Sequence, residues 1–173
     1  MVDPPIGKDP TRRKIVLMGE PAVGKTAVAR RWSMDHFNPR YEATIGVDFY
    51  SQEVLDVGLD LWDISGHPEF AEVRPSYFAG ADAVLMVYDV CTRVSFDSLD
   101  MWIREAQRCG LTSIPYAVCA NKTDQTNKPR LVAPSEGVRW AESRKFRYFE
   151  VSAATGQGIK AMFAELATAL TQA

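Results

Sequence analysis

Short apolar runs alternate along the chain with segments whose apolar residues recur at helical spacing. Residues 14–18 form a run that stops at Gly19, while residues 83–88 and 116–120 have the near-continuous hydrophobicity of central parallel strands. Residues 148–151 are expected to form the last strand. Helices are predicted to begin near Lys25 and Pro134. Two more are predicted from apolar residues at helical spacing. One contains Phe96, Leu99, Trp102 and Ile103, and the other contains Met162, Phe163, Leu166 and Leu170. The pattern predicts an α/β fold with a mainly parallel sheet and helices on both faces.

Residues 49–63 are the exception to this alternation. Gly58 stands in the middle of the segment and suggests a tight hairpin. Such a hairpin is expected to add one antiparallel edge strand to the sheet.

Length and charge limit the classes of protein to consider. At 173 residues the chain fits one domain, because a second packed core would need roughly 100 more residues. We expect a flexible N-terminal segment over residues 1–11 and a single domain over residues 12–173. The 20 basic and 22 acidic side chains give a formal charge of −2, which provides no general attraction for nucleic acid or anionic lipid. Any anion site must therefore be local.

Cysteine usage and the chain ends favour a soluble, cytoplasmic protein. The three cysteines, an odd number without metal-type spacing, argue against a disulfide framework. The first residues lack the apolar run of a signal peptide, and no stretch approaches the roughly 18 apolar residues of a membrane span. Val2 is not the Gly that N-myristoylation requires, and no cysteine for prenylation precedes Ala173. We expect no lipid anchor in this chain, and we expect a monomer.

The most specific motif follows the first predicted strand. Gly19, Gly24, Lys25 and Thr26 fit the pattern G-x-x-x-x-G-K-[ST] and precede a predicted helix. In that context successive backbone N–H groups and the positive helix end can surround a phosphate, Lys25 can neutralise its oxygens, and Thr26 can ligate Mg²⁺. A chance Gly-rich turn is the competing interpretation, and the strand-to-helix context argues against it. The remaining members of the expected binding loop are Ala22, Val23 and Ala27.

A carboxylate and a glycine follow the predicted hairpin. Asp63 could hold Mg²⁺ through water, and the N–H of Gly66 could reach a terminal phosphate. The pattern D-x-x-G is common by chance, so its weight comes from its place after a strand and after the phosphate loop.

Two motifs late in the chain are predicted to read a guanine base. Asp124, in the run Asn121-Lys122-Thr-Asp124, can accept two hydrogen bonds from guanine N1–H and its 2-amino group, a donor pair that adenine lacks. Backbone N–H groups of the last motif could contact guanine O6, and this motif is Ser152, Ala153 and Ala154. Either motif alone could be a surface turn, but both in this order are specific.

With Thr44, these motifs make about residues 12–170 resemble a small GTPase of the Ras superfamily. The resemblance implies the G domain of a P-loop NTPase, with a six-stranded mainly parallel sheet, one antiparallel edge strand, and GTP or GDP with Mg²⁺ as ligands. It also implies that Thr44 coordinates Mg²⁺ in the triphosphate state and releases it after hydrolysis, as a conformational switch. Phe37 would pack against the base; a hydrophobic anchor after the first helix is the alternative.

Residues 44–49, with Trp62 and Tyr77, are similar to Rab proteins, which use Phe, Trp and Tyr at the matching places as an effector-facing aromatic patch. The resemblance therefore implies effector binding through Phe49, Trp62, Tyr77 and the switch regions, in intracellular trafficking. Ordinary core packing of the aromatics is the alternative. An exchange factor and an activating protein are further implied partners.

A narrower likeness is to the Rab-like proteins that carry a C-terminal J domain. It rests on residues 62–70, 119–122 and 135–143. The chain contains no His-Pro-Asp, so we expect it to correspond to the GTPase domain only. Analogy with this group extends the expected location from the cytoplasm to the cilium or basal body.

His67 departs from the Ras-like pattern. It follows Gly66, where active relatives have a Gln that orients the attacking water. A neutral imidazole offers one donor or one acceptor at a time, whereas an amide offers both together. With His67, Lys25 and Gly66 as the catalytic set, we expect weak intrinsic GTP hydrolysis. A solvent-facing residue on a mobile loop is the alternative interpretation of His67.

The expected function is a GTP/GDP molecular switch that recruits effectors when it is loaded with GTP. A non-cycling GTP-bound scaffold, or pseudo-GTPase, is the main alternative, because His67 weakens the catalytic pattern. A P-loop ATPase or nucleotide kinase fits poorly, since the guanine-reading motif suits neither.

Overall fold

A computed structural model describes residue 9 and residues 11–172 of the chain. The expected N-terminal segment 1–11 therefore lies mostly outside the described residues, as does Ala173. In chain order the elements are β1 (Arg12–Met18), α1 (Lys25–Met34), β2 (Val47–Val54), β3 (Val57–Ile64), the short 3-10 helices η1 (Pro68–Phe70) and η2 (Arg74–Tyr77), β4 (Ala83–Asp89), α2 (Arg93–Asp97), α3 (Leu99–Arg108), β5 (Tyr116–Asn121), α4 (Pro134–Glu142), β6 (Arg147–Glu150) and α5 (Ile159–Thr171).

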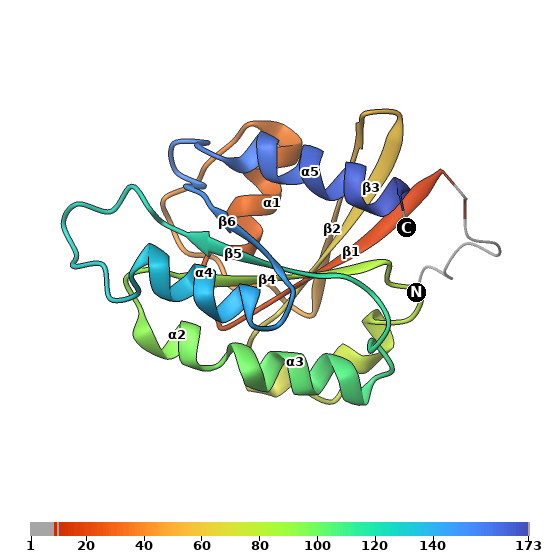
Figure 1. Ribbon diagram of the computed structural model, residues 1–173, viewed down its shortest axis with the longest axis horizontal. Helices are drawn as coiled ribbons and strands as arrows, with labels where there is room; N and C mark the ends of the chain where they lie inside the picture. The colour runs from red at the N-terminus through yellow and green to blue at the C-terminus, as the bar shows by residue number, and fades with distance from the viewer. Residues whose placement is uncertain (1–8, 10, 173) are drawn as a thin grey trace.

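The strands form one six-stranded sheet in the order β2-β3-β1-β4-β5-β6. All neighbouring pairs are parallel except β2 and β3, which run antiparallel at one edge. Helices α1 and α5 cover one face, and α2, α3 and α4 lie on the other (Figure 1). The predicted fold class is therefore confirmed. No helix among the described residues is long and apolar enough to cross a bilayer.

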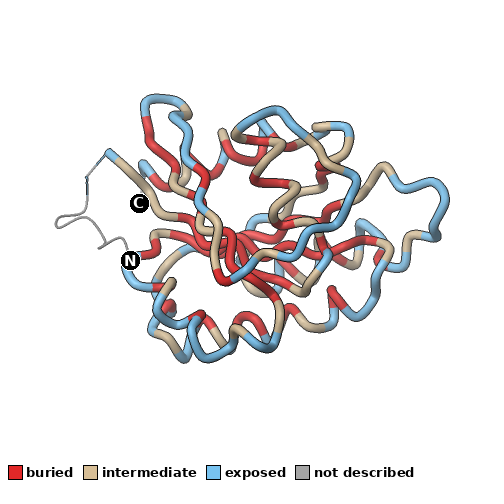
Figure 2. The backbone as a smooth tube through the Cα atoms, turned by 180° about the vertical axis from the view of Figure 1, so that it is seen from behind, coloured by how far each residue is buried: buried red, intermediate tan, exposed pale blue. Residues whose placement is uncertain are grey.

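The central strands are apolar on both sides because each face has its own core. In β1, Ile15 and Leu17 pack with residues of α1 and α5, while Val16 and Met18 pack with residues of α3 and α4. All four side chains are at most 1% exposed. Figure 2 shows the buried segments gathered in the middle of the molecule. A continuous apolar run is the expected signature of such a strand.

The hairpin forms, but Gly58 does not lie in its turn. Val54 pairs with Val57, which leaves Leu55 and Asp56 as a two-residue turn with φ values of 51° and 62°. Positive φ at both central residues is the geometry that matches the twist of a hairpin. Gly58 instead pairs with Glu53 inside β3, where a Cβ would lie 2.8 Å from a guanidinium nitrogen of Arg12. A side chain at this position would crowd Arg12, so glycine leaves room for its guanidinium.

The parallel strands bring their carboxyl ends to one edge of the sheet, where α/β folds bind ligands. The loop before α1 follows β1, and further loops follow β3, β5 and β6. The motifs predicted to bind the nucleotide lie in these loops, at the strand ends next to them (Asp63 in β3 and Asn121 in β5), in the first turn of α1, or in the connection between α1 and β2.

The core under α1 and α5 should be sensitive to truncation at Phe163. This side chain is fully buried, and its ring lies 4.6 Å from that of Trp32. We expect Phe163→Ala to lower the free energy of unfolding by about 3–5 kcal/mol. Val94→Ala, at a position 70% exposed, should change it by less than about 0.5 kcal/mol. Urea unfolding at one fixed nucleotide concentration measures both, and equal losses would contradict this assignment of the core.

Candidate functional site

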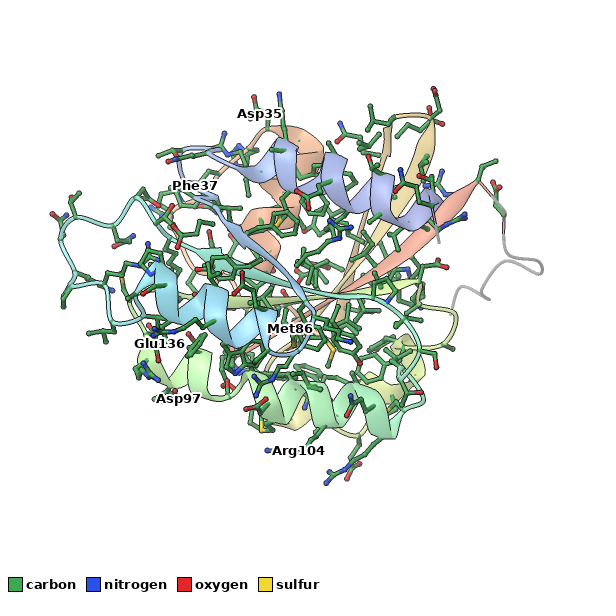
Figure 3. The ribbon with its side chains drawn as sticks, viewed as in Figure 1. Asp35, Phe37, Met86, Asp97, Arg104 and Glu136 are labelled. Carbon is green, nitrogen blue, oxygen red and sulfur yellow. The ribbon has the colours of Figure 1, made fainter. Side chains whose placement is uncertain are left out.

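Loops that follow β1, α1, β3, β5 and β6 surround one cavity of about 230 Å³. Fourteen predicted site residues line this cavity: Ala22, Gly24, Lys25, Thr26, Ala27, Phe37, Thr44, Gly66, His67, Asn121, Lys122, Asp124, Ala153 and Ala154. Of these, Phe37 is labelled in Figure 3. The other four stand behind this lining and bond to it, and they are Gly19, Val23, Asp63 and Ser152. The structure thus brings the predicted set together.

The loop before α1 encloses a buried cation. Gly24 ends the loop with φ at 98°, and a Cβ there would lie 2.4 Å from the Asn121 side chain. The Lys25 ammonium donates to the carbonyls of Gly19 and Glu20, both at 2.9 Å. Burial lowers the pKa of Lys25 to about 8, although the negative charges of Asp63 and Glu20 oppose the shift. A cation that has lost this much hydration favours a polyanionic ligand.

Two hydroxyls and a carboxylate meet beside Lys25. The Thr26 hydroxyl donates to Oδ2 of Asp63 and lies 2.8 Å from the Thr44 hydroxyl. Oδ1 of Asp63 is buried and has no hydrogen-bond partner among the described residues. Burial raises the pKa of Asp63 to about 6, against the lowering effect of Thr26 and Lys25. Hard oxygen ligands and an unsatisfied carboxylate oxygen fit a divalent cation such as Mg²⁺.

The far end of the cavity is built by residues after β5 and β6. The Asn121 side chain donates to the Val23 carbonyl at 2.9 Å and accepts from the Ala153 N–H at 3.1 Å. The Ser152 hydroxyl donates to Oδ1 of Asp124 at 2.6 Å. This bond fixes one carboxylate oxygen, so the Asp124 side chain is oriented before any ligand arrives. A fixed acceptor pair at the cavity wall can select a base by its donors.

Lys122 supports the same end from the side. It has a φ of 68°, and its ammonium donates to the Ala22 carbonyl at 2.8 Å and pairs with Asp89 at 2.8 Å. The ammonium therefore links the loop after β1 to the ends of β4 and β5. Asn121 and Lys122 thus position the site as well as line it.

Gly66 and His67 close the opposite side. A Cβ on Gly66 would lie 2.4 Å from the Gly19 carbonyl, so only glycine lets this segment pack against the loop before α1. Nε2 of His67 lies 2.8 Å from the Tyr41 hydroxyl, which connects the loop after α1 with the loop after β3. His67 is only partly exposed. Its ring therefore has a protein partner and is not simply solvated.

Two supporting residues carried no motif in the sequence. Arg31 on α1 donates to the carbonyls of Ala153 at 2.9 Å and Ala154 at 2.7 Å, and so holds the loop after β6. Tyr41 contacts His67 as described above. The only signal for Arg31 was a cation in the last turn of the first helix, and nothing in the sequence marked Tyr41.

The three aromatic residues of the predicted patch are neighbours on the surface formed by β2, β3 and η2. The Phe49 and Trp62 rings meet edge to face at 4.4 Å, and Tyr77 lies 6.4 Å from Trp62. The ammonium of Lys14 stands 3.3 Å over the Trp62 ring. Phe49 is 60% exposed, and Trp62 and Tyr77 are half-buried. Core packing alone does not account for an arrangement with so exposed a member.

Comparison with known proteins gives the class to which this site and fold belong. The family model of the Ras family matches residues 14–172. The chain therefore belongs to the Ras family of small GTPases, which are P-loop proteins that bind guanine nucleotides.

Among curated proteins, the chain is similar to DnaJ homologues. It is 40% identical to DnaJ homolog subfamily C member 27 of Danio rerio, over 95% of this chain and 63% of that protein. Identity is 42% to member 27-B of Xenopus laevis, over 90% and 60%, and 44% to member 27 of Gallus gallus, over 88% and 59%. The chain thus spans about 60% of the length of these relatives. The narrower resemblance to Rab-like proteins with a J domain is confirmed.

Arg31 should determine how firmly the loop after β6 is held. Arg31→Lys cannot serve two carbonyls in the same planar geometry, so we expect release of a fluorescent GDP to become about three- to tenfold faster. Arg147→Lys is the matched control, because Arg147 makes an exposed pair with Glu165 and neither residue lines the cavity. Stopped-flow dissociation in excess unlabelled GDP measures both rates. Equal rates in the two variants would show that Arg31 has no special role.

Proposed function

We propose that this chain is a Rab-like GTP/GDP switch that uses Mg²⁺, recruits effectors in its GTP state and hydrolyses GTP slowly on its own. The observation that carries the proposal is the convergence of phosphate, metal and base motifs on one cavity. The Asn121 side chain bonds to the phosphate loop at Val23, 98 residues earlier in the chain, and to Ala153, 32 residues later, so it joins two of these motifs directly.

Specificity for guanine is assigned to Asp124. The Ser152 hydroxyl holds one of its carboxylate oxygens at 2.6 Å. The carboxylate can therefore face the N1–H and 2-amino donors of guanine without a reorientation cost. Adenine offers no such pair, and a carboxylate covered by a base that lacks these donors loses its water without gaining partners, at a cost on the order of several kcal/mol.

Mg²⁺ would be held by Thr26, Thr44 and Asp63, the last directly or through water. When bound, the ion would neutralise charge on the phosphates. Thr44 belongs to the loop after α1, so its bond to the site depends on the position of that loop. This dependence is the basis on which a switch between two loop positions is proposed.

Slow intrinsic hydrolysis is proposed from the surroundings of His67. Its Nε2 is 2.8 Å from the Tyr41 hydroxyl. A neutral imidazole with one nitrogen engaged in this way has a single nitrogen left for water. It cannot both accept from the water and donate to a developing charge, as an amide can.

The same contact supports a second candidate, a GTP-bound scaffold that does not cycle. Tyr41 and His67 belong to the two loops that cover the cavity, and their bond ties these loops together. A protein that stays closed over GTP would present a constant surface to its partners. In both candidates the exposed Phe49, with Trp62 and Tyr77, is the proposed surface for effectors.

Nucleotide retention tests the proposed ligand set. We expect purified protein to retain GTP and GDP, but not ATP, through gel filtration in Mg²⁺. Chelation of Mg²⁺ should speed release by at least about tenfold, since a bound divalent cation contributes several kcal/mol. Chromatography of the retained nucleotide gives both results. Equal retention of ATP would contradict the assignment of Asp124, and an unchanged rate in chelator would contradict that of Thr26, Thr44 and Asp63.

His67→Gln tests the proposed cause of slow hydrolysis. Because the amide can donate and accept together, we expect the single-turnover rate to rise roughly tenfold or more. Tyr41→Phe, which only frees the imidazole, is the companion variant and should give a smaller rise. Conversion of bound GTP to GDP over several hours provides the rates. An unchanged or lower rate in His67→Gln would contradict the proposal that His67 causes slow hydrolysis.

A further inference from the structure

A second buried cation lies outside the cavity lining. Arg74 begins η2 and is only 5% exposed. Its guanidinium makes a two-pronged ion pair with Glu105 of α3, at 2.6 Å and 3.1 Å. The remaining nitrogen, Nη1, donates to the carbonyls of His67 at 3.0 Å and Ser65 at 3.4 Å. These two carbonyls flank Gly66, so one side chain fixes the backbone on both sides of that glycine.

The guanidinium of Arg74 is also connected, through Trp102, to the loop before α1. Its Cζ lies 4.9 Å over the ring of Trp102, which is 2% exposed and one helical turn from Glu105 on α3. The Trp102 ring nitrogen donates to the Glu20 carboxylate at 3.2 Å. Arg104, between these two positions, projects away from the fold (Figure 3). The inner face of α3 therefore contacts both segments that meet at Gly66.

These contacts close a ring. Gly66 packs on the backbone of Glu20, where an added Cβ would lie 2.8 Å from the carbonyl carbon. Glu20 bonds to Trp102, Trp102 supports Arg74, and Arg74 holds the residues on either side of Gly66. A displacement of residues 65–67 would break several of these contacts at once, and it would leave a buried charge with fewer partners.

We propose that Arg74 is a positioning residue that holds residues 65–67 against the loop before α1 and thereby favours binding of GTP over GDP. The inference rests on the proposed function, together with the expectation from the sequence that the N–H of Gly66 reaches the terminal phosphate, which GDP lacks. Residues that hold the base and the inner phosphates bond to one another without Arg74. A loss of Arg74 is therefore expected to weaken the GTP complex selectively.

The test compares dissociation of fluorescent GDP and of a fluorescent non-hydrolysable GTP analogue from the full chain in Mg²⁺. Arg74→Lys keeps the charge but loses the planar fork that serves a carboxylate and two carbonyls together. We expect release of the GTP analogue to become about tenfold faster, and release of GDP to change by less than about threefold. Glu105→Gln, which leaves Arg74 in place with a weaker anchor, should shift the ratio in the same direction. It also keeps the test decisive if Arg74→Lys does not fold.

Arg144→Lys is the matched control. Arg144 also makes a two-pronged pair with a carboxylate of α3, Asp100, and also lies over a Trp ring, that of Trp140 at 4.1 Å. It makes no hydrogen bond to residues 65–67 in the described part of the chain. The control should leave the GTP-to-GDP ratio unchanged.

The outcomes separate this proposal from the proposed function. Suppose that the wild type retains both nucleotides. If Arg74→Lys and Glu105→Gln then leave the ratio of the two release rates at its wild-type value, the role of Arg74 is overturned and the proposed switch stands. A shift of the ratio in Arg144→Lys as large as that in Arg74→Lys would also overturn it, because any loss at α3 would then suffice. If the wild type retains neither nucleotide, both proposals fail.

Discussion

The arrangement of the site depends on two hydrogen bonds made by the side-chain amide of Asn121. It donates to Val23 in the loop before α1 and accepts from Ala153 in the loop after β6. The residue is 1% exposed, so both bonds are shielded from water, and loss of the amide would remove a partner from two backbone groups of buried residues. A cavity wall made from three separate loops is thereby reduced to one rigid unit at the ends of the parallel strands.

The opposite wall is held in a different way, by a side chain from outside the cavity lining. Its residues, 65–67, follow β3 and receive hydrogen bonds from Arg74, which is anchored in turn on α3. The loop after α1 contacts this side through Tyr41, which lies against His67, and through Thr44, whose hydroxyl donates to Asp63 at 3.5 Å. One wall is thus joined by a buried amide, while the other is held by a buried guanidinium and by the contact between Tyr41 and His67. The base loops and the loop before α1 are thus joined to each other, while residues 65–67, expected beside the terminal phosphate, are held separately, and the proposed switch requires such a division.

The parts of this fold that could be predicted are those in which the relevant interaction is local or repeats along the chain. Central strands were recognisable because strands covered on both faces have continuous apolar runs. Lys25 was recognisable because the phosphate-binding loop has a fixed spacing of Gly and Lys in the sequence. The hairpin was predicted from Gly58, but the turn is made by Leu55 and Asp56, which accept positive φ without the usual Asn-Gly sequence. Strand pairing, and not turn composition, determines the position of that turn.

Supporting residues could not be predicted because they act on backbone carbonyls, which leave no trace in the sequence. Arg31 bonds to Ala153 across 122 positions, and any residue could supply that carbonyl. Arg74 and Glu105 lie 31 positions apart, and neither belongs to a motif. Motifs record the atoms that face a ligand. The groups that hold those atoms in place become visible only when the fold has brought distant segments together.

Burial acts in opposite directions on the two central charges of the site, and this explains why the cavity favours a charged ligand and a metal together. It lowers the pKa of Lys25 to about 8 and raises that of Asp63 to about 6, so each charge is less stable here than in water. Their mutual attraction offsets only part of this cost in both cases. A phosphate chain beside Lys25 and a cation beside Asp63 would each supply the missing opposite charge, and each would also neutralise the other. Because water is largely excluded, these contacts are stronger than they would be at the surface. Burial leaves the charges of Lys25 and Asp63 only partly compensated, and this costs free energy. On the proposed function, nucleotide and metal therefore bind together, because each compensates one of these charges.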